Sequence, residues 1–170
     1  GAGGADRSGA TVGGHAPAGA MSPRPVALRV IASEAARAAG DILRERFVMR
    51  GELAVRTKSS STDMVSEADE AAEAAIRRIL GARRPDDAIL GEEGGRTGTG
   101  ELEWVVDPLD GTTNFLYGIP AWCVSVAVRA GDGVIAGVGC VPFGEEVCAA
   151  GRAGGAPGCG WGGGGGGGVW

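Results

Sequence analysis

The sequence predicts an α/β fold, a layered sandwich in which helices pack against a largely antiparallel sheet. Two stretches early in the chain, 26–49 and 66–83, repeat apolar residues at helical spacing. Three runs rich in β-branched and aromatic residues follow at 101–106, 122–128 and 134–141. A chain with helices first and strands afterwards folds with the helices on the sheet, so this order predicts the layered class.

The first predicted helix is 26–49, followed by a short strand at 51–58 and a loop at 59–62. The second helix is expected to begin at Ser66. Ser66 and Asp69 form the pattern Ser-x-x-acid, a capping box that binds the free N–H groups of a first helical turn. The apolar face of the first helix is formed by Val30, Ile31, Ala35, Ala38, Ile42, Leu43 and Phe47.

The predicted strands begin with 87–90, which leads into a Gly-Glu-Glu-Gly segment. The strand at 101–106 is expected to stop at Pro108, since proline has no N–H to donate. Ala-Gly-Asp-Gly at 130–133 joins the last two β-branched runs and predicts a hairpin. A final short strand is expected at 146–149.

The length of 170 residues fits one domain, which we place at 26–153. Residues 1–25 are rich in Gly, Ala and Pro, and a disordered leader is expected there, with Met21 as a possible start of translation. Residues 154–170 have no hydrophobic periodicity and contain an unbroken glycine run at 162–168. We expect a disordered tail, or a truncation or frameshift artefact, in that segment.

The charge pattern narrows the range of partners. A formal net charge of −5 without a Lys/Arg run argues against nucleic acid. No apolar stretch has the length of a membrane span or the form of a signal peptide, so no membrane partner and a cytoplasmic location are expected. Cys123, Cys140, Cys148 and Cys159 lack CxxC spacing, which favours buried thiols over a disulfide framework. His15 is the single histidine, which excludes Ser-His-Asp and Cys-His triads.

The most informative stretch is Trp-Val-Val-Asp-Pro-Leu-Asp-Gly-Thr-Thr-Asn-Phe at 104–115. It delivers two carboxylates, Asp107 and Asp110, at the end of an apolar run, followed by Gly111 and Thr112 where a helix can begin. Carboxylates beside free backbone N–H groups suit a hard divalent cation next to a phosphate. The same stretch also fits an ordinary Asp/Gly turn between strands.

Two further segments set acids beside hydroxyls or glycines, at 62–63 and at 91–94. If one fold gathers these acids with Asp107 and Asp110, each pair at about 4 Å repels by about 4 kcal/mol at an effective dielectric of about 20. Bound Mg²⁺ turns that repulsion into attraction. A gathered cluster therefore predicts Mg²⁺ as a cofactor.

These motifs resemble the inositol monophosphatase family. The resemblance covers about 26–153 and implies the layered, largely antiparallel α/β sandwich of that family, with its second half missing. It is carried by Lys58, Thr-Asp-Met-Val-Ser-Glu-Ala-Asp at 62–69, Gly-Glu-Glu at 91–93, the stretch at 104–115 and Tyr-Gly-Ile-Pro at 117–120.

The resemblance implies hydrolysis of a phosphate monoester with Mg²⁺ as cofactor. Glu92, Asp107 and the backbone carbonyl of Leu109 would hold the metal that activates water, and Asp110 would share a second metal with Asp107. Glu92 is therefore expected to serve both as a metal ligand and in catalysis.

Two more roles are implied by the resemblance. Thr112, paired with Asp63, would orient the attacking water and help to move its proton. The backbone N–H groups of Gly111 and Thr112 would bind the phosphate of the substrate. Asp69 is expected to act only as the capping acid of the second helix.

The family continues into a second αβ half with a Trp-Asp-x-Ala motif that this chain lacks, so an incomplete and weakly active or inactive fragment is expected. The segments at 113–115 and 117–120 favour an inositol monophosphatase, with a small phosphorylated polyol as substrate and a possible homodimer when full length. The alternatives are a sister phosphatase acting on a nucleotide 3′-phosphate, fructose bisphosphate or histidinol phosphate, and a non-catalytic metal-binding fragment.

Overall fold

A computed structural model describes residues 23–57, 60–131 and 133–152. The expected leader up to residue 22 and the expected tail from residue 154 lie outside the described residues, as does Lys58. The elements in chain order are α1 (Pro23–Thr57), α2 (Ser61–Arg83), β1 (Ala88–Gly91), β2 (Gly95–Thr97), β3 (Leu102–Asp110), α3 (Thr112–Tyr117), β4 (Cys123–Ala130), β5 (Gly133–Val141) and β6 (Glu146–Gly151).

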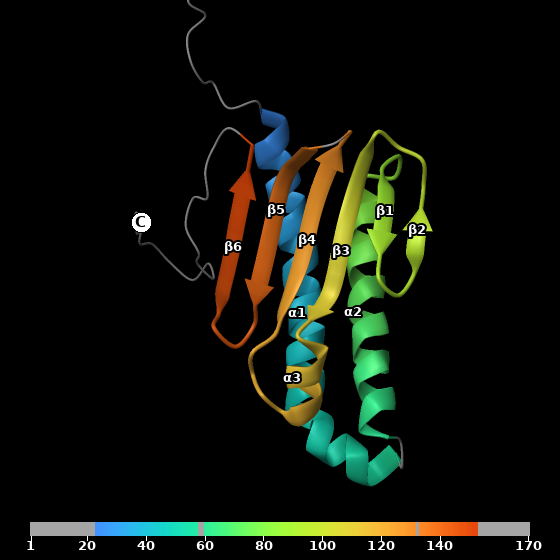
Figure 1. The fold of residues 1–170 in the computed structure, drawn as a ribbon, viewed down its shortest axis with the longest axis vertical. Coiled ribbons are helices and arrows are strands. Elements are labelled where there is room, and N and C mark those ends of the chain that lie inside the picture. The colour runs from blue at the N-terminus through green and yellow to red at the C-terminus, as the bar shows by residue number, and fades with distance from the viewer. Residues whose placement is uncertain (1–22, 58–59, 132, 153–170) are drawn as a thin grey trace, which may run out of the picture.

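The strands form one sheet in the order β2-β1-β3-β4-β5-β6. The helices α1 and α2 lie side by side against one face of this sheet, and α3 lies at the end where β3 finishes (Figure 1). Only β1 and β3 pair in parallel, while each other neighbouring pair is antiparallel. The prediction of a layered α/β fold with a largely antiparallel sheet is confirmed.

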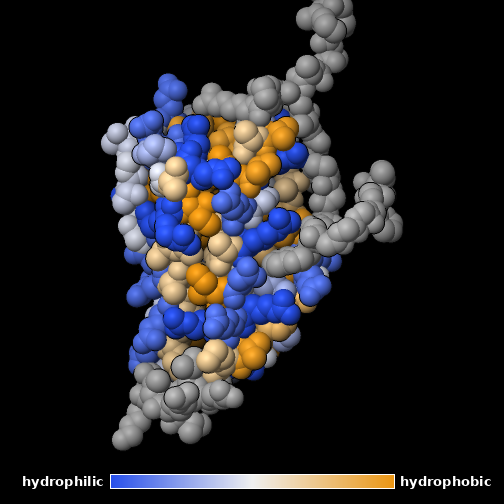
Figure 2. Space-filling view, turned by 180° about the vertical axis from the view of Figure 1, so that it is seen from behind, coloured by the Kyte–Doolittle hydropathy of each residue, from blue (hydrophilic) through white to orange (hydrophobic). Residues whose placement is uncertain are grey.

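The core lies between the two long helices and the sheet. Its helical side includes Leu43 and Ile76, both fully buried, and its sheet side includes Val126 and Val128. Alternate residues of β4 from Val124 to Val128 are buried because successive side chains of a strand point to opposite faces. On the outward surface of the helical layer, hydrophilic and hydrophobic residues are mixed (Figure 2).

The strand predicted at 51–58 is wrong, because α1 continues without a break to Thr57. The stretch after Met49 alternates apolar and polar residues over too few positions to distinguish a strand from a helix. An established helix propagates at little cost per residue, so the single glycine at 51 does not end it.

The predicted start of the second helix is also wrong. The N-cap of α2 is Ser60, whose hydroxyl accepts the N–H of Asp63 at 3.1 Å. The Asp63 carboxylate accepts the N–H of Ser60 in return, at 3.3 Å, which completes a capping box. Ser66 and Asp69 lie inside the helix, although they show the same Ser-x-x-acid pattern. Asp69 is thus free for another role.

Pro108 does not stop β3, which runs to Asp110. The pairing of β3 with β1 ends one residue before Asp107, and its pairing with β4 is irregular between Asp107 and Asp110. Proline is tolerated at such a bulge because no ladder bond requires its missing N–H. The strand therefore carries both carboxylates past the end of β1.

The remaining predicted strands and the hairpin between β4 and β5 are confirmed, while the short β2 was not predicted. Cys123 and Cys140 are free thiols, whereas Cys148 is disulfide-bonded, so the expectation of reduced cysteines is wrong for Cys148.

None of the helices in the described ranges is long and apolar enough to cross a membrane.

Trp104 provides a test of the packing between α2 and the sheet. Its side chain is fully buried, and its indole N–H donates to the carboxylate of Asp87 at 2.9 Å. Trp104→Phe is expected to lower the free energy of unfolding by about 2–4 kcal/mol, because it leaves a cavity and removes a hydrogen bond to a charged acceptor. Urea unfolding measures this loss. The exposed control Val134→Ala should change it by less than about 0.5 kcal/mol, and an equal loss in both variants would contradict the assignment.

Candidate functional site

Acidic side chains from three elements meet where β1 and β3 end. The two strands are parallel and pair Gly91 with Val106, so the next residues, Glu92 and Asp107, lie side by side where β1 ends. Carboxyl ends of neighbouring parallel strands lie at the same edge of a sheet, where ligands commonly bind. The helix α2 adds Asp69, whose carboxyl is near enough to Glu92 and Asp107 to interact electrostatically.

Asp107 lies at the centre of this acidic site. Burial raises the pKa of the Asp107 carboxyl, and the negative charges of Glu92 and Asp110 raise it further. Its Oδ1 atom is buried and has no hydrogen-bond partner among the described residues. A buried carboxylate oxygen without a donor is costly, so this position favours an added positive charge.

Asp69 shows the same features more strongly. Its residue surface is 6% exposed, and its Oδ1 is also buried without a partner in the described part of the chain. Burial raises its pKa to about 7, with further contributions from the charges of Glu93, Glu92 and Asp107. The interpretation of Asp69 as a helix cap alone is therefore wrong.

Sequence reasoning missed Asp69 although a signal was present. The buried residues Val65, Ala72 and Ile76 form the inner face of α2, and Asp69 falls on that face at helical spacing. A carboxylate on the apolar stripe of a helix is rarely fully buried without a partner or a cation.

These carboxylates fit a hard cation. Two orphaned oxygens, on Asp69 and Asp107, point to a missing positive partner, and Mg²⁺ and similar ions prefer oxygen ligands. Among the residues that the structure describes, no three His, Cys, Asp or Glu side chains form a ready metal-binding group. The acids are thus close enough to raise one another's pKa, but they do not form a closed coordination shell.

Most of the other predicted site residues lie at the start of α3. The Thr112 hydroxyl donates to the carbonyl of Leu109 at 3.0 Å, which ties the expected catalytic residue to the expected carbonyl ligand. Gly111 is the N-cap of α3 with a φ of 96°, a left-handed conformation that favours glycine. Asp63 is exposed, and its carboxylate accepts the N–H of Ser60. Neither this hydrogen bond nor the one from Thr112 to Leu109 joins Asp63 to Thr112.

Cys123 borders the site from β4. Its thiol lies 3.8 Å from Oδ2 of Asp110, and burial together with the charge of Asp110 raises its pKa. The thiol therefore stays protonated at neutral pH and donates to Asp110. Cys123 therefore adds no charge to the site.

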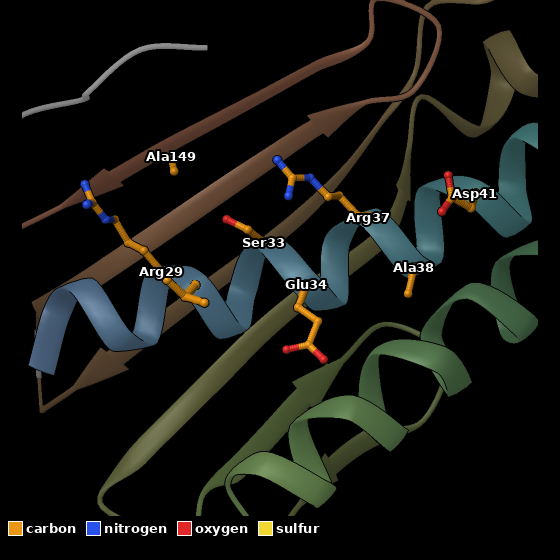
Figure 3. A pocket seen from close by; sticks show the side chains of 8 residues that line it. Arg29, Ser33, Glu34, Arg37, Ala38, Asp41 and Ala149 are labelled. Atoms are coloured by element: carbon orange, nitrogen blue, oxygen red, sulfur yellow. The ribbon is translucent and has the colours of Figure 1, made fainter. Parts of the chain in front are cut away.

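A separate hollow of about 630 Å³ runs along α1 beside β6 (Figure 3). It is lined by Arg29, Ser33, Arg37 and Asp41 of α1 and by Ala149 of β6, among others. The predicted site residues in the described ranges do not line it. This hollow is therefore a different feature from the acidic site.

The parallel strand pair, the acidic strand ends and the helical layer define a class of α/β proteins with a carboxylate-rich site. A family model described as "Inositol monophosphatase family" matches residues 26–160. The chain belongs to the inositol monophosphatase family. Phosphatases of this family include inositol-1-monophosphatases and a histidinol-phosphatase.

Specific relatives agree with this membership. The chain is 47% identical over 93 residues to an inositol-1-monophosphatase SuhB of Mycobacterium tuberculosis, covering 51% of this chain and 32% of the relative. It is 49% identical over 77 residues to a histidinol-phosphatase of Streptomyces coelicolor, covering 45% and 29%. The structure of the extragenic suppressor protein suhB from Bartonella henselae matches with a TM-score of 0.66 at 37% identity, covering 76% of this chain and 50% of that chain. This chain spans about half or less of the length of these relatives.

The acidic site predicts an unusual pH dependence of stability. The unfolded chain releases the Asp69 proton near the ordinary pKa of 3.8, while the folded protein holds it until about 7. The folded state therefore binds more protons between these values, and the stability of the metal-free protein falls as pH rises from 3.8 to about 7. Each unit of difference corresponds to at most about 1.4 kcal/mol.

Thermal melts in EDTA at pH 5 and pH 8 test this dependence. Asp69→Asn is expected to remove part of the decrease, and added Mg²⁺ is expected to reverse it in the wild-type chain. Subtracting the variant's curve removes the opposing effect of groups such as Glu73, whose pKa lies below its ordinary value. An identical decrease in wild type and variant would show that Asp69 is not the responsible group.

Proposed function

We propose that this chain is the metal-binding half of a Mg²⁺-dependent phosphomonoester hydrolase whose substrate is an inositol monophosphate. The observation that carries the proposal is the pair of buried carboxylate oxygens on Asp69 and Asp107, beside Glu92, which have no hydrogen-bond partner among the described residues. Membership of a phosphatase family supports the same reaction class. The chain spans half or less of the length of these relatives, and we propose that turnover needs the second half.

In this proposal, Glu92, Asp107 and the Leu109 carbonyl would hold one Mg²⁺, and Asp107 and Asp110 would share a second. When bound, the ion acidifies a water molecule and neutralises charge on the phosphate and the leaving oxygen. The bond from Thr112 to Leu109 fixes the hydroxyl next to the carbonyl ligand, where it can orient the attacking water.

Asp69 takes the role that the sequence assigned to Asp63. Its carboxyl adjoins Glu92 and Asp107, and a pKa near neutrality is suited to accepting a proton during attack. Asp63 is engaged in capping α2, which accounts for its conformation. The attacking water would therefore lose its proton to the Asp69 carboxylate.

The backbone N–H groups of Gly111 and Thr112 are proposed to bind the substrate phosphate. Gly111 has no side chain to cap these groups, and α3 begins directly after it. Because its backbone is in a left-handed conformation and a Cβ would meet the Ala121 carbonyl at 3.0 Å, a larger residue does not fit there.

We also propose that the protein is located in the cytoplasm and that the full-length protein is a homodimer.

Histidinol phosphate is the second candidate substrate. The relative of that name in Streptomyces coelicolor is as similar over its matched segment as the inositol-1-monophosphatases are. Both substrates are phosphate monoesters of a small alcohol, so the metal site alone does not discriminate between them. Discrimination between the two substrates depends on side chains that contact the alcohol part of the ester.

Phosphate release from a substrate panel tests the function. The chain as it stands and the chain continued by the second half of the Mycobacterium tuberculosis relative are incubated with inositol-1-phosphate, histidinol phosphate, a nucleotide 3′-phosphate and fructose bisphosphate, in Mg²⁺ or EDTA. We expect Mg²⁺-dependent release by the extended chain, fastest with inositol-1-phosphate, and little by the shorter chain. A folded extended chain that releases phosphate from none of the four would refute the proposal.

A further inference from the structure

A buried ion pair on α2 holds the segment that carries Glu92. The side chain of Glu73 is almost fully buried, and its carboxylate accepts the backbone N–H groups of Glu93 and Gly94, each at 2.8 Å. The guanidinium of Arg77 donates to the same carboxylate through Nε at 2.7 Å. Three donors thus compensate the burial of one charge, which gives Glu73 a fixed position.

Arg77 extends this network to β2. Its Nη1 donates to the Thr97 hydroxyl at 2.9 Å, and its Nη2 donates to the Gly95 carbonyl at 2.6 Å. The turn after β1 is therefore bonded on one side to Glu73 and on the other to Arg77. The planar guanidinium makes all three contacts at once, which a lysine cannot do.

The glycines on either side of Glu92 and Glu93 fit this ion pair. A Cβ at Gly91 would overlap the carboxylate of Glu73, and a Cβ at Gly94 would lie 2.8 Å from both Arg77 Nε and Glu73 Oε1. Both glycines of the Gly-Glu-Glu-Gly segment thus lie where the Glu73 and Arg77 side chains of α2 pack against the turn. A solvated turn would place no such demand on both positions.

We propose that Glu73 is a positioning residue that fixes the turn after β1 so that Glu92 faces Asp107 and a bound metal ion. This inference rests on the proposed function, since it assigns the metal to these acids. Arg77 supports Glu73, and the two glycines make room for both. We call this network of hydrogen bonds from Glu73 and Arg77 to the turn after β1 the Glu73–Arg77 clamp.

Without the clamp, the turn would lose two backbone hydrogen bonds while β1 and β3 stayed paired. Glu92 would then sample many positions, and each bound ion would have to order it again. Partners that orient metal ligands change metal affinity by about 10- to 100-fold when they are removed. The loss should therefore appear in metal affinity more than in the fold.

The test is Mn²⁺ binding by the folded 170-residue chain, followed by the electron paramagnetic resonance signal of free Mn²⁺. In Glu73→Gln the dissociation constant is expected to rise about 10- to 100-fold. The same variant should show faster hydrogen exchange at the Glu93 and Gly94 amides, with exchange at Ile76 and Leu80 unchanged. This exchange readout needs no metal and separates a loosened turn from a loosened helix.

A second variant covers the case in which Glu73→Gln does not fold. Gly94 is exposed, and Gly94→Ala pushes against Arg77 and Glu73 without touching the core. It is expected to weaken Mn²⁺ binding in the same direction. Gly81→Ala is the matched control, because a Cβ at Gly81 meets nothing within 4 Å, and it should leave both readouts unchanged.

The outcomes separate this inference from the proposed function. If wild type binds no Mn²⁺, the metal site and with it the role of Glu73 are both refuted. If wild type binds Mn²⁺ but folded Glu73→Gln or Gly94→Ala binds it within about twofold of wild type, the proposed function survives and the clamp is refuted. Weaker binding with faster exchange at Glu93 and Gly94 supports the clamp.

Discussion

Asp107→Asn is expected to reduce Mg²⁺-dependent phosphate release by about 10³-fold or more in the chain continued by a relative's second half. Asp107 interacts with Glu92 and with Asp110, so it is the acid through which both proposed metal positions are joined. Loss of one charge–charge contact of about 4 kcal/mol corresponds to a factor of about 10³ in rate. Phosphate release at saturating Mg²⁺ measures the effect.

Asp86→Asn is the control for this prediction. Asp86 is exposed and lies before β1, away from the strand ends. Its replacement is expected to leave turnover within about twofold of wild type, as is usual for exposed positions that make no special contact. Turnover of Asp107→Asn close to that of Asp86→Asn would remove Asp107 from the site.

Asp69→Asn is expected to reduce turnover by about 10²-fold or more in the same extended chain, because proton transfer by a positioned side chain contributes about that much. Asp63→Ala should have a different consequence. Loss of its capping box lowers the free energy of unfolding by about 1 kcal/mol, while turnover well below the melting temperature stays within about twofold.

The paired measurement of turnover and thermal stability distinguishes these two acids. Asp69→Asn should not reduce the stability of the metal-free protein at pH 8, since it removes a buried charge that its neighbours repel. If instead Asp63→Ala lost turnover and Asp69→Asn kept it, the pairing of Thr112 with Asp63 expected from the sequence would be restored.

The fold was largely predictable because its patterns are local. Apolar spacing on α2 and the β-branched runs of β4 and β5 identify these elements from the chain alone. The end of α1 was not predictable in this way, because the stretch after Met49 is short and alternating. The continuation of β3 past Pro108 depends on where its neighbours stop pairing, which is a property of the sheet.

The site was predictable only in part for the same reason. Glu92, Asp107 and Asp110 stand out because they follow strand-like runs, and the structure places them near one another. Asp69 and Asp63 are both acids in a Ser-x-x-acid pattern, and only the position of the helix start separates the cap from the buried acid. The role of Glu73 could not be predicted, since two of its three partners are backbone N–H groups about twenty positions away.

The parallel pairing of β1 with β3 has a consequence for how the protein folds. Parallel neighbours cannot be joined by a tight hairpin, so the chain must complete the excursion through β2 before Glu92 and Asp107 meet. Such non-local contacts form late, after the entropy of closing the loop has been overcome. A cation would then bind only after β1 and β3 have paired. Because it binds only the folded state, a higher cation concentration would shift the folding equilibrium further towards that state.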